Sequence, residues 1–158
     1  MRNLFLLSIL CFIFACNNDT VEPSKEVSED AVIWTGAATT FTKAADADPT
    51  LEANQDRITD NVWLTRGTNG GQIFNAKDEN NSDKNDSPKG TLWAEGSIDN
   101  IENLTFEPFR TAVGSPKSVV GKDLVLFLQD DDIYLSVKFT SWAQSKSGAF
   151  SYERSTEN

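Results

Sequence analysis

Acidic and amide side chains are concentrated in one polar segment, where they could bind a hard cation. The oxygen atoms come from Asp46, Asp48, Glu52, Asn54 and Asp56. Calcium takes about six to eight oxygen ligands, and flexible loops can supply them. The spacing is not that of an EF-hand loop, so the alternative is a solvated acidic loop whose Asp and Asn residues stabilise turns. The segment therefore predicts either a Ca²⁺ site or a series of turns.

Aromatic side chains suggest a second chemistry, the stacking of rings on sugars. Tyr and Trp combine a large apolar ring with a polar group, which suits the two faces of a saccharide. If residues 133–142 form a strand, alternation places three aromatic or charged residues on its more polar face, and residues 148–154 add two more. The expected ligand face comprises Tyr134, Lys138, Trp142, Tyr152 and Arg154. The alternative is that the indoles are core residues, which we expect for Trp34 and Trp63.

The chain contains no histidine, and this narrows the catalytic options. Sites of the Ser-His-Asp and Cys-His types are excluded, as is zinc bound by histidine. A net charge of −10 argues against nucleic acid as a partner, because phosphate backbones are repelled by an acidic protein. We therefore do not expect an enzyme; a glycosidase with two carboxylates is the remaining catalytic alternative.

Short apolar runs separated by turn residues predict the elements that must position these side chains. The strongest pair is 124–129 and 133–142, which the turn Asp130-Asp131-Asp132 should join as an antiparallel hairpin. Residues 107–113 could hold one helical turn that begins near Pro108. Further strands are expected at 31–35, 39–43, 61–65, 72–75, 91–95, 103–106 and 148–154. These runs indicate an all-β fold, an antiparallel β-sandwich or jelly roll, formed by residues 31–158 as a single domain.

The N-terminus has the pattern of a secretory signal, in which a cationic start is followed by an apolar run. Arg2 supplies the charge, and the run extends from residue 4 to residue 14. The sequence Ile13-Phe14-Ala15-Cys16 that ends this run resembles the lipobox of bacterial lipoproteins. The resemblance implies cleavage after residue 15 and acylation of Cys16, with palmitate among the added chains. Several acyl chains anchor a protein stably to a membrane.

The polar composition of residues 16–30 predicts a flexible, lipidated tether between the membrane and the domain. The expected location is the cell envelope, at the outer membrane rather than the inner one. Cys11 lies inside the apolar run and is expected to have no role of its own.

Several local motifs of the domain also resemble a small domain that recurs in secreted and cell-surface bacterial proteins. They are residues 48–67, 70–76, 87–94, 104–110, 131–142 and 150–156. The resemblance covers residues 33–156 and implies an extracellular type of domain without an assigned activity. We therefore expect a membrane-anchored envelope lipoprotein with a non-catalytic binding module for glycans or another surface component. The alternative is a calcium-stabilised structural lipoprotein that binds another protein.

Overall fold

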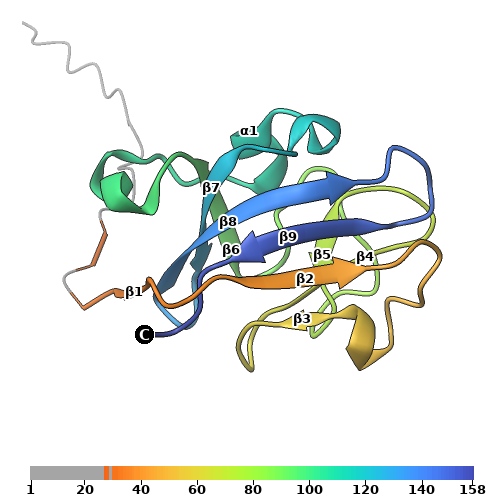
Figure 1. Cartoon of the computed structure of the whole chain (residues 1–158), viewed down its shortest axis with the longest axis horizontal. Helices are drawn as coiled ribbons and strands as arrows, with labels where there is room; N and C mark the ends of the chain where they lie inside the picture. The colour runs from red at the N-terminus through yellow and green to blue at the C-terminus, as the bar shows by residue number, and fades with distance from the viewer. Residues whose placement is uncertain (1–26, 29) are drawn as a thin grey trace, which may run out of the picture.

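Two β-sheets face each other in the computed structural model, which describes residues 27, 28 and 30–158 (Figure 1). The larger sheet has six strands, in the order β2-β9-β8-β7-β6 with β1 beside β8, and the smaller sheet has the order β3-β4-β5. The expected all-β sandwich is therefore confirmed. The strands are β1 (Val32–Trp34), β2 (Thr39–Lys43), β3 (Asp56–Arg57), β4 (Trp63–Arg66), β5 (Ile73–Asn75), β6 (Thr91–Glu95), β7 (Asp123–Leu128), β8 (Ile133–Trp142) and β9 (Phe150–Arg154).

Strand β8 organises the larger sheet because it pairs along both of its edges. It forms the expected antiparallel hairpin with β7, in which Leu128 lies opposite Ile133. On its other edge, β1 pairs in parallel with the first part of β8, and β9 pairs antiparallel with the second part. The carboxylate of Asp131 in the hairpin turn accepts hydrogen bonds from Thr59 Oγ1 and Asn61 Nδ2, which stabilise its charge.

Short helices connect the strands and differ in part from the sequence prediction. They are the 3₁₀ turns η1 (Glu52–Asn54), η2 (Ile98–Asn103) and η3 (Pro116–Ser118), and the helix α1 (Phe109–Val113). The helical turn after Pro108 is confirmed as α1. The strand expected at 103–106 is wrong, because residues 104–106 have no regular structure. Strand β3 was not predicted, since it is two residues long and lies within a polar connection.

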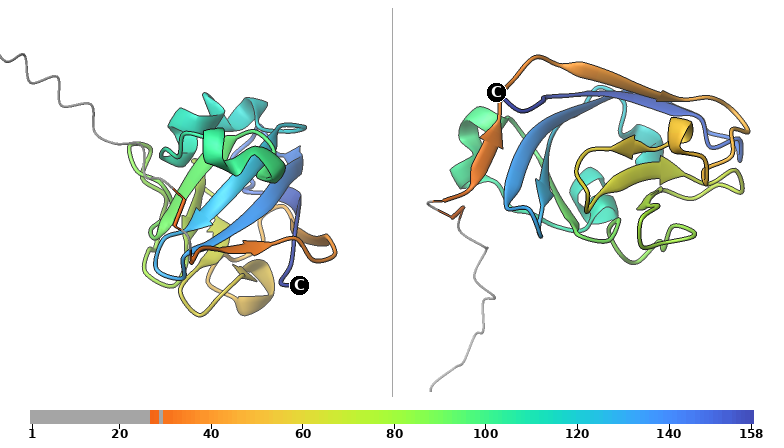
Figure 2. Two further views of the ribbon diagram at one scale, coloured as in Figure 1. Left: turned by 90° about the vertical axis from the view of Figure 1, so that its left-hand side faces the viewer. Right: turned by 90° about the horizontal axis from the view of Figure 1, so that it is seen from below.

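The main core lies between the two sheets, which Figure 2 shows as separate layers. Leu124, Leu126 and Leu128 alternate along β7 and point toward Leu64 and Ile73 of the smaller sheet, and all five are at most 1% exposed. Each such side chain contributes about 1.5–3 kcal/mol when it is removed from water. Their packing therefore holds the sheets face to face.

A second apolar cluster covers the opposite face of the larger sheet. Val125, Phe127 and Tyr134 form its centre, and the ring centroids of Phe127 and Tyr134 are 4.3 Å apart in a stacked arrangement. Residues from β1, from η2 and from the segment that follows η2 pack over them. Both faces of β7 and of the first part of β8 are consequently buried.

One buried ion pair joins the sheets through polar contacts. Arg154 of β9 donates from Nε and Nη2 to Asp56 of β3, at 2.7 and 3.0 Å, and the hydroxyl of Tyr152 donates to the same carboxylate at 2.6 Å. Burial and the negative charge of Asp56 raise the pKa of Tyr152 well above its usual value of 10. Burial alone would lower the pKa of Arg154, but the hydrogen bond and charge of Asp56 outweigh it and raise this pKa.

We predict that Asp56→Asn lowers the free energy of unfolding by about 3 kcal/mol, because it leaves the Arg154 charge buried without a counterion. Urea denaturation at neutral pH measures the change. Glu52→Gln is the matched control: it removes one carboxylate from an exposed ion pair with Arg57, so its effect should stay below about 1 kcal/mol. Equal losses in the two variants would contradict a special role for the buried pair.

Candidate functional site

The predicted ligand face is not a single exposed surface, and this part of the prediction is wrong. The alternation along β8 is interrupted between Phe139 and Ser141, where the pairing with β9 shifts register. The shift turns Trp142 toward the core, where it is 7% exposed and contacts the ring of Phe139. Tyr152 is fully buried in the same core, while Tyr134 is buried on the opposite face of the sheet.

The two charged members of the predicted face are both engaged in ion pairs. Lys138 Nζ lies 2.8 Å from Asp123 Oδ1 at the surface, and Arg154 binds Asp56 between the sheets. A cavity of about 390 Å³ is lined in part by Lys138 and Arg154. No aromatic ring is among the described residues that line it, so it lacks the stacking surface that the prediction required.

The acidic segment forms turns rather than a ligand set. Asp48 Oδ1 accepts hydrogen bonds from the amide and hydroxyl of Thr50, which lower the pKa of Asp48, and Asn54 Nδ2 donates to the backbone oxygen of Asp48. Glu52 and Asp56 point to arginines instead. Within residues 27, 28 and 30–158, no group of three or more His, Cys, Asp or Glu side chains could hold a metal ion. The five expected calcium ligands are therefore not brought together.

A different surface, the outer face of the smaller sheet, combines an accessible indole with polar groups. Leu64 and Ile73 point inward, and alternation places Trp63 and Phe74 on the outer face of β4 and β5. Trp63 is partly buried, whereas Trp93 is fully buried. A cavity of about 210 Å³ opens here, and its polar lining is supplied by Thr50, Gln55, Arg57, Glu79 and Asn80. We call this cavity the Trp63 pocket.

Arg57 fixes the polar rim of the Trp63 pocket. Its guanidinium carbon lies 4.1 Å from the ring centroid of Trp63, within the range of a cation–π contact. Its Nε and Nη2 both donate to Gln55 Oε1 at 3.2 Å, and Nη1 pairs with Glu52 Oε2 at 3.1 Å. One face of the indole is thus covered by a cation whose position is set by its neighbours.

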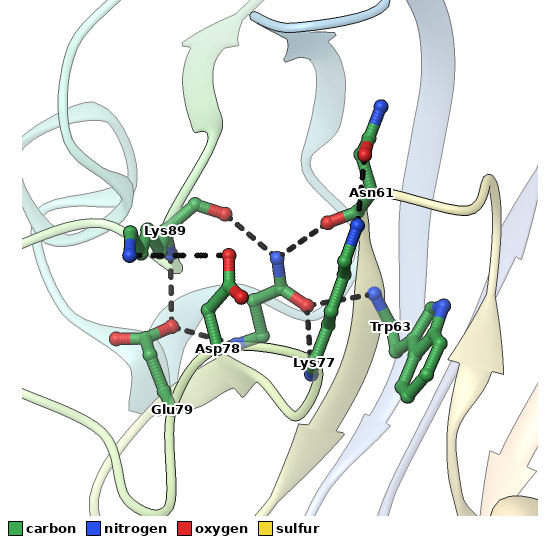
Figure 3. A network of polar contacts seen from close by, with 7 residues as sticks. Asn61, Trp63, Lys77, Asp78, Glu79 and Lys89 are labelled. Carbon is green, nitrogen blue, oxygen red and sulfur yellow. Dashed lines mark hydrogen bonds and ion pairs between the residues drawn. The ribbon is translucent and has the colours of Figure 1, made fainter.

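Asn75 ties together segments next to the pocket through a polar network that includes Asn61, Lys77 and Lys89, which Figure 3 shows from close by. Its Oδ1 accepts from the backbone amides of Trp63 and Lys77, and its Nδ2 donates to the backbone oxygens of Asn61 and Lys89. All four hydrogen bonds that a primary amide can make are formed. The side chain therefore ties the start of β4 to both ends of the loop over residues 77–89.

Glu79 belongs to the same network and is the one carboxylate among the described residues that line the Trp63 pocket. Its Oε2 accepts from the amides of Asn75 and Lys89, both at 2.8 Å, so its position is fixed by β5 and by the end of the loop. Glycosidases ordinarily use two carboxyl groups that flank the scissile bond. A single carboxylate can orient a ligand through hydrogen bonds but does not form such a pair.

We predict that Asn75→Asp lowers the free energy of unfolding by about 3 kcal/mol and weakens this polar network. The substitution places an oxygen against two backbone oxygens and leaves both without a donor, and each unsatisfied buried group costs about 1–3 kcal/mol. Thermal or urea unfolding checks this. Asn80→Asp, an exposed change on the same loop, should alter stability by less than about 0.5 kcal/mol. A neutral effect of Asn75→Asp would contradict the network.

Comparisons of the chain with protein-family models, with curated proteins and with solved structures found no match. The part of the chain that the structure describes contains no helix that is long and apolar enough to cross a membrane. Residues 1–26 lie outside this part, and so do the expected signal and the expected acylation of Cys16.

Proposed function

We propose that this protein is a lipid-anchored binding module of the bacterial envelope, held by Cys16, whose ligand is a glycan bound at the Trp63 pocket. The observation that carries the glycan assignment is the partly exposed Trp63 ring in a cavity rimmed by amide, carboxylate and guanidinium groups. Apolar surface with a few converging polar groups is what small-molecule sites typically provide. A sugar needs both, because its C–H face packs on rings and its hydroxyls need hydrogen-bond partners.

The proposed module is non-catalytic, and two features support this. The chain lacks histidine, which is the most frequent general base at neutral pH. The Trp63 pocket has Glu79 alone as a carboxylate among its described lining residues, so the pair used by most glycosidases is not formed there.

A glycan array with the purified chain tests the ligand assignment, and calorimetry then measures affinity for the oligosaccharide that binds best. We expect Trp63→Phe to weaken binding about tenfold or more, because a smaller ring covers less of the sugar. Trp34→Phe is the matched control, since Trp34 is also partly buried but lies in β1 of the other sheet. Equal binding by both variants, or no glycan bound by the unaltered chain, would contradict the proposal.

The anchor is tested separately, by metabolic labelling with palmitate in a bacterial host. We predict that Cys16→Ser abolishes the label and moves the protein from the membrane fraction to the soluble fraction, because the acylated thiol is lost. Cys11→Ser should retain both the label and the membrane fraction. Label that persists in Cys16→Ser would refute acylation at this residue.

A further inference from the structure

A second pocket differs from the rest of this acidic protein in its charge. It is a cavity of about 300 Å³ between the β4–β5 loop, the α1–η3 region and the β8–β9 hairpin. Its cations are Arg66, Arg110, Lys117 and Lys146. No Asp or Glu is found among the described residues that line it, although the chain as a whole carries a net charge of −10. We call it the cationic pocket.

These four cations also differ from most others in the described chain, because they form no ion pair with any described carboxylate. Five other cations each form an ion pair with a carboxylate. They are Arg57, Lys89, Lys122, Lys138 and Arg154. Like charges that share a cavity repel one another, and the repulsion is stronger where protein excludes water. An anion bound between these cations would therefore reduce their repulsion.

Arg66 forms the inner wall of the cationic pocket and is 3% exposed. Its Nε donates to the backbone oxygen of Gly71, and its Nη1 donates to those of Ala143 and Ala149, each at 3.1 Å. The guanidinium carbon lies 4.0 Å from the ring centroid of Trp142. Burial lowers the pKa of Arg66 to about 10, so it remains a cation at neutral pH. Its Nη2 has no acceptor among the described residues.

Arg110 supplies a second guanidinium from α1. Its Nε is buried, yet it has no hydrogen-bond partner in the described part of the chain. A buried donor without an acceptor costs about 1–3 kcal/mol, and a ligand oxygen that reached this donor would recover the cost. Arginine forks match carboxylate and phosphate oxygens in geometry. The guanidinium groups of Arg66 and Arg110 thus both line the cavity and both retain donors for an anion.

The walls of the cationic pocket are fixed by contacts between its segments. Gln144 Nε2 donates to the backbone oxygen of Lys117 at 3.0 Å, which ties the hairpin to η3. Gly148 has a φ of 70°, and a Cβ atom there would collide with the carbonyl oxygen of Gly67. A glycine at this position therefore lets the β8–β9 hairpin approach the β4–β5 loop and close the cavity on that side.

We infer that the cationic pocket binds the oxyanion group of a small acidic ligand, namely a phosphate, sulfate or carboxylate carried on a molecule of about monosaccharide size. The volume lies at the lower end of the range of small-molecule sites, about 300–1,000 Å³. Ser115, Gln144 and Ser145 add hydroxyl and amide groups that suit the uncharged part of such a ligand. The inference goes beyond the proposed glycan site, because it concerns different residues and a charged ligand.

Calorimetry on the full chain tests the inference with inorganic phosphate, inorganic sulfate, glucose 6-phosphate and glucuronate, with glucose as the neutral probe. We expect saturable binding of at least one anion below about 10 mM and none of glucose in this pocket. The double variant Arg110→Gln/Lys146→Gln should raise Kd about tenfold or more, since two charged donors are lost. Added NaCl should weaken binding to the unaltered chain.

Lys84→Gln/Lys77→Gln is the matched control, because it removes two exposed positive charges from another loop and should leave Kd unchanged. The melting temperature of the double variant without ligand, measured at low salt, should equal or exceed that of the unaltered chain, because repulsion is relieved. A tighter Kd for the sugar acids than for the inorganic anions would identify the ligand as an acidic saccharide, and equal values would identify the anion alone. No anion binding, or the same Kd in both double variants, would overturn the inference.

Discussion

The structure depends most on a buried guanidinium that has no carboxylate partner among the described residues, that of Arg66. It belongs to β4 of the smaller sheet, yet its hydrogen bonds reach the backbone oxygens of Ala143 and Ala149 near the ends of β8 and β9. Stacking on Trp142 fills the remaining space. The same side chain therefore joins the two sheets and gives the cationic pocket its permanent charge.

Two of the polar connections between the sheets neutralise charge in different ways. At one of them Asp56 meets Arg154 directly, so the charges cancel within the protein. At the other, Arg66 is surrounded by carbonyl dipoles, and Lys43 lies buried nearby with an Nζ that has no hydrogen-bond partner in the described chain. Burial and the charge of Arg66 lower the pKa of Lys43. Asp46 and Asp48 act on Lys43 in the opposite direction, and Arg66 is the cation of this connection that lines the cationic pocket.

The sequence predicted the strands well where apolar residues alternate over several positions. Strand β8 follows this pattern, whereas β7 is a continuous apolar run because both of its faces are buried. Strand β3 was missed because two polar residues carry no periodicity. Its position is set by Asp56, whose partners are nearly a hundred residues away in the sequence.

The candidate sites were harder to predict, because each depends on contacts between distant segments. The register shift after Phe139 reversed the orientation of Trp142, and no local pattern in the sequence indicates such a shift. Trp63 was expected to be a core residue, and this prediction is wrong, because alternation with the buried Leu64 places it on the outer face of β4. The cationic pocket combines cations from three separate segments, so spacing along the chain could not reveal it.

The inferred anion site depends on guanidinium groups that keep hydrogen-bond donors available for a ligand. Nitrogen-detected NMR of the arginine Nε–H groups during titration with glucose 6-phosphate tests this most directly. We expect the Nε–H resonance of Arg110 to shift and saturate, while those of Arg66 and Arg154, whose Nε groups are already bonded to Gly71 and Asp56, move much less. An Arg110 resonance that does not respond, or that drifts together with that of Arg154, would contradict the anion site.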